Sequence, residues 1–487
     1  MSMPADKHSG TLSSTTGGRW GELMVAVVAG LGMFLGALDI AVNVGLPSIT
    51  TAFNTDLETV QWIIVSFVAT RAGLVMGAGS FADRFGLREV YIFGASVYLV
   101  AMICIALSPN LGSVVGFRVL QALGTGSLFA VSPAILVRLF PAERRGLSMG
   151  FATASQALGM LAGTLGAGLL VQWTGWQAVF LGRIPFIVLA LVLAVMFLGR
   201  ESRPRLKASF DIAGATLLMA ALICLVVGMR LGRSQGWDHP AVLTLLPLAP
   251  ILLGIFWWAE GRAQWPVLPR EFFRVRGVVF AGASVFLVHL GVFVIWFIFP
   301  FYVSDGLGRG PFTLGALLAV MAAFNAVFSG VGGWLCDKAG TMPVGMYGLI
   351  VLTLGLVYVG FLDNDSSLTQ VGLRMAAVGA GMGLFQAAAY TLMMSSVPDQ
   401  RFGTAAASLS LAQSFGTVLS VAAIGGIFTL IEDHRLAGLV SASVTTTQAM
   451  DLAFVLAFQD VFRLGAVLVA LGAGVFLFSP RRRRVDP

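Results

Sequence analysis

Charge is scarce in this chain of 487 residues: only 11% of them are Asp, Glu, Lys or Arg, against about 25% in a typical soluble protein. Hydrophobic residues make up 57% of the sequence. The 30 basic and 23 acidic side chains could not screen the apolar surface that such a chain would expose in water. A soluble enzyme is therefore excluded.

Cysteine is also scarce, and the motifs of common active sites are missing. Cys104, Cys224 and Cys336 lie far apart, without the paired spacing of a metal site or a disulfide framework. The sequence has no phosphate-binding loop, zinc-protease motif or nucleophile elbow, so we expect no enzyme activity, no cofactor and no direct use of ATP. The first 20 residues are polar, and we expect no secretory signal there.

Long apolar runs dominate what is present. Each is about long enough to cross a roughly 30 Å hydrocarbon layer as a helix. Fourteen such runs lie at 22–47, 58–81, 89–108, 111–137, 147–171, 176–199, 210–231, 240–260, 277–303, 312–334, 342–362, 368–395, 403–431 and 456–479. With the N-terminus inside, 21 Lys or Arg fall on inner segments and four on outer loops. The positive-inside rule thus predicts a multi-pass cell-membrane protein with both termini cytoplasmic, and the net charge of +7 reflects topology rather than nucleic-acid binding.

An internal repeat relates the two ends of the chain. The segment from Gly79 to Gly86 returns as Gly333 to Gly340, at an offset of 254. Five further identities share an offset of 257: Pro141, Arg144, Gly146, Gln156 and Gly159 return as Pro398, Arg401, Gly403, Gln413 and Gly416. Because the offset spans eight helices, both copies run in the same direction. A parallel repeat predicts a substrate path between two similar halves.

These segments carry a family resemblance. Gly79 to Arg88 resembles the loop signature of the major facilitator superfamily, and Leu38 to Pro47 resembles the first-span motif of its fourteen-helix drug:proton antiporters. Arg118 to Gly124 is similar to the fourth-span motif. Two positions depart: Thr164 stands where proline is usual in the fifth-span antiporter motif, and Arg183 where asparagine is usual.

The predicted fold is an all-α membrane protein of 14 transmembrane helices, with two six-helix bundles and a two-helix insert. We expect a cytoplasmic tail at 1–20, an N-terminal bundle at 21–200, the insert and its linkers at 201–276, a C-terminal bundle at 277–480 and a basic cytoplasmic tail at 481–487.

Asp39 is the only carboxylate expected deep inside the N-terminal bundle, about 12 Å from the outer surface at 1.5 Å per residue. A carboxyl there can carry a proton, because burial favours its neutral form and a neighbouring arginine favours its charged form. The alternative is a permanent ion pair that only fixes helix packing. The resemblance implies that Arg118 exchanges the proton or tunes the carboxyl; Arg118 could instead be an anchor to backbone carbonyls.

Several polar residues are candidate substrate contacts: Asp39, Asn43, Arg71, Gln156, Arg183, His289, Asn325 and Gln413. Three buried arginines, Arg71, Arg118 and Arg183, against Asp39 would leave this half of the cavity positive. The hypothesis is an anionic, zwitterionic or neutral amphiphile as substrate, unless Arg71 and Arg183 pair with carbonyls or helix ends. Isolated polar residues such as His289 and Asn325 are more often hydrogen-bonded core residues than ligands, and His289 is a second candidate proton site because histidine titrates near neutral pH.

Two further sets concern movement and packing. A conformational gate is expected at the repeated inner turn: Gly79, Asp83, Arg84, Gly86, Arg88, Asp337 and Lys338. An aspartate at a helix end there can pair with an arginine or a neighbouring helix N-terminus and latch one conformation. Gly159, Gly163 and Gly416 are expected to permit close helix packing.

The predicted function is a secondary transporter that exports amphiphilic drugs or toxic metabolites by alternating access, driven by the proton gradient. Its expected partners are a small amphiphilic substrate, protons and membrane lipids, and we expect a monomer. The alternatives are a dedicated exporter or lipid transporter for one endogenous anionic amphiphile, and a sensor that uses the same fold without transport.

Overall fold

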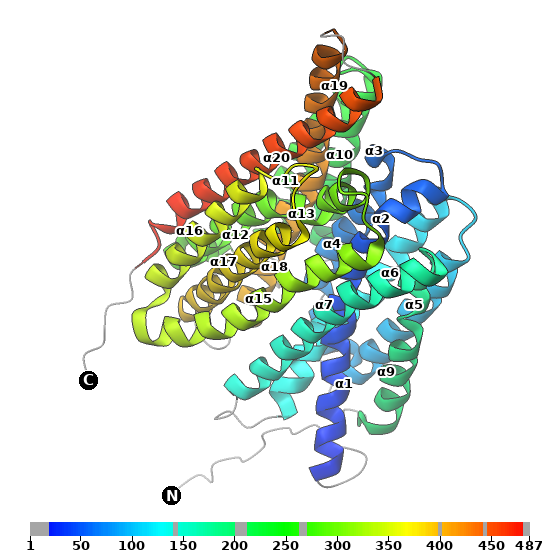
Figure 1. The fold of residues 1–487 in the computed structure, drawn as a ribbon. Helices are drawn as coiled ribbons and strands as arrows, with labels where there is room; N and C mark the ends of the chain where they lie inside the picture. Colours follow the sequence, from blue (N-terminus) through cyan, green and yellow to red (C-terminus); the bar gives the residue numbers. More distant parts are fainter. Residues whose placement is uncertain are drawn as a thin grey trace, which may run out of the picture.

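The computed structural model describes residues 19–139, 145–199, 212–262, 270–397, 402–441 and 446–480. All regular structure within these ranges is helical (Figure 1). The N half runs through α1 (Arg19–Ala37), the 3-10 helix η1 (Leu38–Ile40), α2 (Ala41–Ala52), α3 (Leu57–Val60), α4 (Trp62–Phe85), α5 (Leu87–Ala106), α6 (Leu111–Leu139), α7 (Arg145–Thr174), α8 (Ala178–Leu181) and α9 (Ile184–Phe197).

The C half follows a helical pair, α10 (Ile212–Gln235) and α11 (Pro240–Glu260). It runs through η3 (Arg270–Arg274), α12 (Arg276–Val292), α13 (Val294–Phe297), α14 (Phe299–Phe301), the π-helix η4 (Tyr302–Gly306), α15 (Pro311–Ala339), α16 (Thr341–Val359), α17 (Leu368–Ser395), α18 (Phe402–Leu419), the π-helix η6 (Ser420–Ile424), α19 (Gly425–Ser441) and α20 (Thr446–Phe476).

Eleven helical segments in the described part of the chain are long and apolar enough to cross a membrane. The predicted spans at 58–81, 210–231 and 403–431 are not among them, although α4, α10 and α18 occupy these stretches. Each of the three contains residues whose side chains lie outside the described part. The total of 14 transmembrane helices therefore stays a prediction, as do the domain boundaries, of which the one at 200/201 falls on residues that are not described.

The turn that recurs in the sequence also recurs in the backbone. Gly86 joins α4 to α5 with φ 98° and ψ 148°, and Gly340 joins α15 to α16 with φ 89° and ψ 162°. This region of backbone conformation is essentially restricted to glycine. The two turns have the same geometry at equivalent places in the two halves.

The α10–α11 pair touches both halves. The two helices pack on each other, and α10 also packs on α4 of the N half and on α18 of the C half. Leu218 of α10 and Phe256 of α11 form a small buried cluster with Leu411 of α18. The pair therefore covers the seam between the halves on the side of α4 and α18, while α7 packs against α15 at a second seam.

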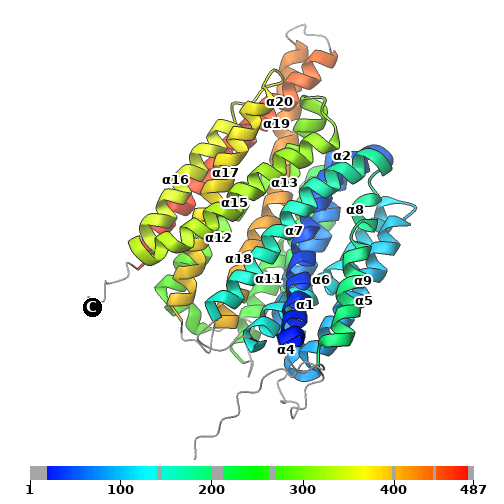
Figure 2. The ribbon, with the colours of Figure 1, turned by 60° about the horizontal axis from the view of Figure 1, so that its bottom comes forward.

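The two halves meet at one end of the molecule and separate toward the other. The end of α7 packs on the start of α15, where Gly168 lies against the backbone of Pro311 and Phe312. α2 contacts α14 and α15 at the same end. From there the helices of the two halves diverge in both views (Figures 1 and 2). We refer to the end where the halves meet as the closed end.

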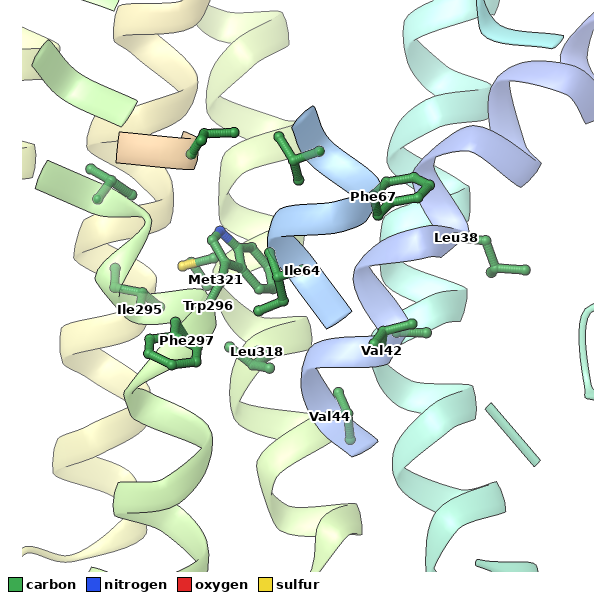
Figure 3. Close-up of a cluster of buried hydrophobic side chains, with 14 of the residues drawn as sticks. Leu38, Val42, Val44, Ile64, Phe67, Ile295, Trp296, Phe297, Leu318 and Met321 are labelled. Atoms are coloured by element: carbon green, nitrogen blue, oxygen red, sulfur yellow. The ribbon is translucent and has the colours of Figure 1, made fainter. Parts of the chain in front are cut away.

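A buried apolar cluster joins the halves near the closed end. In Figure 3, Ile64 of the N half lies beside Trp296, Leu318 and Met321 of the C half, whereas Leu38 lies on the far side of the first helix and points away from the C half. Each of these side chains is at most 8% exposed. Apolar contacts of this kind have no directional bonds, so they can close and reopen without leaving unpaired polar groups.

Candidate transport site

Asp39 lies at an interruption of the first long helix. Its 3-10 segment, η1, separates α1 from α2, and a short 3-10 stretch inside a span often marks a functional hinge. α7 approaches this segment closely, because Gly163 lies against the carbonyl of Leu38 and Gly159 against the backbone of Phe34. The two glycines expected to permit close packing thus lie against the helix that carries Asp39.

One oxygen of Asp39 accepts all of its hydrogen bonds. The Oδ1 atom receives Arg183 Nη1 at 2.5 Å, Gln121 Nε2 at 2.5 Å and the Tyr98 hydroxyl at 3.1 Å. The other oxygen, Oδ2, is buried and has no partner in the described part of the chain. Since buried polar atoms are normally hydrogen-bonded, this oxygen is an available acceptor inside the N half.

Arg183 is the counter-ion of Asp39. It lies between α8 and α9 and is 1% exposed, while Asp39 is 7% exposed. Its Nε and Nη2 atoms are buried without a partner among the described residues. The sequence offered carbonyls or helix ends as alternative partners for Arg183; the structure pairs it with the carboxylate instead.

Arg118 joins the same network through a second residue. Its Nη1 donates to Gln121 Oε1 at 2.6 Å, its Nε donates to the Ile63 carbonyl at 3.0 Å, and its guanidinium lies 4.2 Å from the centre of the Phe67 ring. Arg118 therefore combines a carbonyl anchor with an indirect link to Asp39. The amide of Gln121 connects the two charges.

Arg71 lies outside this hydrogen-bonded network. It is half-buried, and its guanidinium carbon is 5.4 Å from the Phe67 ring centre and 5.9 Å from that of Phe129. It is near enough to Asp39 and to Tyr390 of the C half to interact with them electrostatically. Of the three arginines expected in this half of the cavity, Arg118 and Arg183 are thus buried around Asp39, and Arg71 is half-buried.

The other predicted contacts are distributed over both halves. Asn43 is buried in α2, Gln156 is half-buried in α7, and Asn325 Nδ2 lies 3.4 Å from Gln386 Oε1 within the C half. His289 Nδ1 lies 2.9 Å from the Val285 carbonyl, and Gly416 lies against this histidine and the backbone of Phe286. Gln413 Nε2 donates to the Tyr390 hydroxyl at 3.1 Å. None of these residues is in the Asp39 network.

The predicted gate is only partly described. Gly79, Asp83 and Arg84 lie in α4, but their side chains are outside the described part. Arg88 donates to the Val195 carbonyl of α9 at 3.2 Å and pairs with Glu89 at 3.9 Å, so its bonds stay within the N half. At the equivalent C-half turn, Asp337 is exposed and Lys338 Nζ lies 4.0 Å from the centre of the Trp334 ring.

Three polar residues of this region were absent from the predicted site: Tyr98, Gln121 and Tyr390. Gln121 lies one helical turn after Arg118, and that spacing could have indicated a contact. Tyr98 gives no such signal, because a single tyrosine in an apolar run is equally compatible with the membrane interface. Tyr390 belongs to the other half, and no spacing in the sequence relates it to Arg71.

Comparison with known proteins places this architecture in a family. The sequence model of the Major Facilitator Superfamily matches residues 23–421. The chain belongs to the major facilitator superfamily. Consistent with that membership, it is a multi-pass membrane transporter rather than an enzyme.

Several relatives of this superfamily member are named as resistance proteins. The multidrug resistance protein Stp of Mycobacterium tuberculosis is 28% identical over 409 residues, which cover 83% of this chain and 76% of Stp. The tetracenomycin C resistance and export protein of Streptomyces glaucescens is 28% identical over 417 residues, covering 85% and 76% of the two chains.

Solved structures of transporters share this fold. A bacterial homologue of the human lysosomal transporter Spinster matches with a TM-score of 0.66 and 15% identity. The match covers 95% of this chain and 98% of that structure. At this identity the likeness concerns the fold alone.

Proposed function

We propose that this major facilitator superfamily member exports amphiphilic compounds in exchange for protons, with Asp39 as the proton carrier. The observation that carries the proposal is the free, buried Oδ2 of Asp39 beside an Oδ1 that already holds three donors. A proton arriving at Oδ2 would neutralise the carboxylate and weaken its attraction for Arg183. The resistance functions named for Stp and the tetracenomycin C protein support export.

Alternating access supplies the transport cycle in this proposal. The positive-inside prediction puts the closed end on the outer side of the membrane, so that the diverging end faces the cytoplasm. A change in the charge of Asp39 acts at η1, which lies against Gly163 of α7, and α7 forms the closed end with α15. Protonation is thereby connected, through packed backbone, to the contact between the halves.

The test is dye transport by proteoliposomes under an imposed pH gradient, with Asp39→Asn against wild type. Asp39→Asn is expected to lose uphill transport, because the amide cannot bind and release a proton. Asp460→Asn is the matched control: it makes the same change at the exposed pair with Arg435, 2.8 Å apart, and is expected to keep transport.

One cationic and one anionic dye are measured in the same vesicles. Uphill transport by Asp39→Asn, with normal protein content in the vesicles, would remove Asp39 from coupling and direct attention to His289. A wild type that binds dye and never moves it under a gradient would contradict transport itself.

A further inference from the structure

Arg71 is a cation without a fixed partner at the middle of the membrane region. It lies 10 residues into α4, about 14 Å along the axis from Trp62 at 1.5 Å per residue. No hydrogen bond or ion pair of its guanidinium is formed with any residue that the structure describes; the ring centres of Phe67 and Phe129 lie 5.4 Å and 5.9 Å from its guanidinium carbon. An intramembrane arginine is costly, so unpaired donors there point to a ligand.

The C half contributes two polar residues near this position, Tyr390 and its partner Gln413. Tyr390 of α17 is 37% exposed, and its hydroxyl accepts a hydrogen bond from Gln413 of α18. The Tyr390 hydroxyl retains a proton to donate, because the bond from Gln413 uses only an oxygen lone pair. Arg71 and Tyr390 are within electrostatic range of each other. Tyr390 therefore brings a donor of the C half within electrostatic range of the Arg71 donors.

The charged groups around this position are Asp39, Arg118 and Arg71 itself, with Tyr390 as a further titratable group. The carboxylate is already bound to Arg183 inside the N half, where both side chains are nearly inaccessible. A cation between the halves would meet Arg71, while Asp39, the carboxylate within electrostatic range, is buried and paired with Arg183. An oxygen acceptor would meet up to five N–H donors and a phenol.

We propose that Arg71, Tyr390 and Gln413 form a ligand site shared by the two halves, and that its ligand is an aromatic amphiphile presenting an oxygen acceptor, uncharged or anionic. Phe67 and Phe129 supply the aromatic surface beside the guanidinium, and Arg71 and the Tyr390 hydroxyl supply the donors. The site rests on the proposed function only in that its ligand is the transported compound. Binding itself requires no proton gradient.

The charge of Asp39 influences how tightly Arg71 can bind an anion. Its negative charge partly offsets the field of Arg71, so removing that charge strengthens the attraction of Arg71 for an anion. Asp39→Asn is therefore expected to bind an anionic ligand more tightly than wild type, and an uncharged ligand about equally. A ligand that sat on Asp39 itself would respond in the opposite direction, because the variant would remove its partner.

The experiment is equilibrium binding to the purified protein in detergent, with fluorescein as the anion, 7-methoxycoumarin as the uncharged acceptor and ethidium as the cation. Arg71→Gln is expected to weaken fluorescein binding roughly 10- to 100-fold, the range of a hydrogen bond to a charged group. Tyr390→Phe is expected to weaken binding of both acceptors roughly 2- to 10-fold. Arg435→Gln, an exposed arginine of the C half, is the control and is expected to change neither.

Arg71→Lys separates folding from recognition, since it keeps the charge and loses the planar fork; it is expected to bind fluorescein with intermediate affinity. The proposal is overturned if ethidium binds more tightly than both acceptors, if neither acceptor binds, or if Arg71→Gln, melting as wild type does, binds fluorescein unchanged. These outcomes are independent of coupling: loss of gradient-driven transport in Asp39→Asn, with tighter fluorescein binding, supports both proposals separately.

Discussion

The ion pair between Asp39 and Arg183 lies wholly inside the N half, on the side of Tyr98 and Gln121 rather than between the halves. Two opposite charges in such a place are costly to bury, and their attraction offsets that cost only while both are present. Arg183 stands where the transporters that this sequence resembles usually have asparagine, and here it is the partner of Asp39. Arg183 therefore supplies the counter-ion for this buried carboxylate.

Arg183→Asn is expected to destabilise the protein by about 3–5 kcal/mol, because it leaves a buried carboxylate without its counter-ion. Thermal unfolding in detergent measures the effect. Arg435→Gln is the matched control: its pair with Asp460 is exposed, and loss of such a pair costs about 0–1 kcal/mol. Equal melting temperatures for Arg183→Asn and wild type would show that the pair contributes nothing to stability.

A double-mutant cycle tests whether Asp39 and Arg183 interact. The double variant Asp39→Asn with Arg183→Asn removes both charges and is expected to recover part of the stability lost in Arg183→Asn. Additive effects of the two changes would indicate that the side chains do not interact.

Individual residues were the part of the site that the sequence predicted least completely. Asp39, Arg118 and Arg183 stood out as charges at similar depth in apolar runs, and the structure brings all three to one network. Depth along a helix does not give direction around it, so the sequence could not separate Arg183, inside the N half, from Arg71, beside the C half. Tyr98 and Tyr390 gave no signal, because a lone tyrosine has many uses in a membrane helix.

At the scale of a single helix, two glycines of α7 can be compared, one closely packed and one not. A side chain added at Gly159 would meet the backbone of Phe34, whereas one added at Gly166 would meet nothing within 4 Å. Gly159→Ala is expected to cost about 1–3 kcal/mol, because the backbone of α1 must move away. Gly166→Ala is expected to be neutral or to stabilise by up to about 1 kcal/mol. Melting temperatures of the two variants test this, and a larger loss in Gly166→Ala would contradict it.

The substitution of threonine for proline also acts at the scale of a helix. The Thr164 hydroxyl donates to the Met160 and Leu161 carbonyls at 3.1 Å, within an unbroken helix from Arg145 to Thr174. Proline at this position would remove a backbone donor and favour a kink. α7 is thus continuous through the segment that reaches α15.

α19 extends past the predicted span at 403–431 and carries Glu432. Burial, with a smaller contribution from the neighbouring Asp433, raises the pKa of Glu432 from its ordinary value of 4.5 to about 7. Because the folded-state pKa is the higher one, this carboxyl contributes stability that is fully present below pH 4.5 and is lost as the pH rises to about 7.

Hydrogen exchange over 425–441 is therefore expected to be slower at pH 5 than at pH 8 after correction for intrinsic rates. Glu432→Gln is expected to remove the difference, since the amide does not titrate. Asp433→Asn is expected to reduce it only slightly, because Asp433 is the smaller cause. A wild-type difference that persists in Glu432→Gln would assign the effect to another group.

At the scale of the whole molecule, the two halves touch closely where Gly168 of α7 meets Pro311 and Gly315 of α15. A methyl group there would press on backbone of the opposite half. Gly168→Ala is therefore expected to disfavour the closed end and to populate a state in which this end is wider.

Spin labels at Leu107, exposed at the end of α5, and at Leu368, exposed at the start of α17, measure that change as a distance distribution, because both lie at the predicted outer ends of their spans. A longer mean distance in Gly168→Ala is expected, and Gly166→Ala, on the same helix but free of neighbours, is expected to match wild type. An unchanged distribution in Gly168→Ala would show that the contact does not hold the closed end.

The overall architecture was more predictable than its details. Continuous apolar runs predict helices because lipid offers no hydrogen-bond partner to the backbone, and the described regular structure is helical. The repeated glycine turn reappears as two turns of the same backbone geometry, since few other residues adopt it. How α10 and α11 lie against the halves was not predictable, because an apolar surface that faces a protein and one that faces lipid have the same composition.

The separation of Asp39 from Arg183 along the chain has a consequence for biosynthesis. The two residues are 144 positions apart, so a ribosome adding roughly 5–20 residues per second makes the arginine about 7–29 s after the aspartate. During that interval the first helix enters the membrane with a carboxyl that lacks its counter-ion. A nascent chain arrested before Arg183 should therefore hold its first helix less firmly than one arrested after it, which makes the sixth predicted span the step that completes insertion of the first.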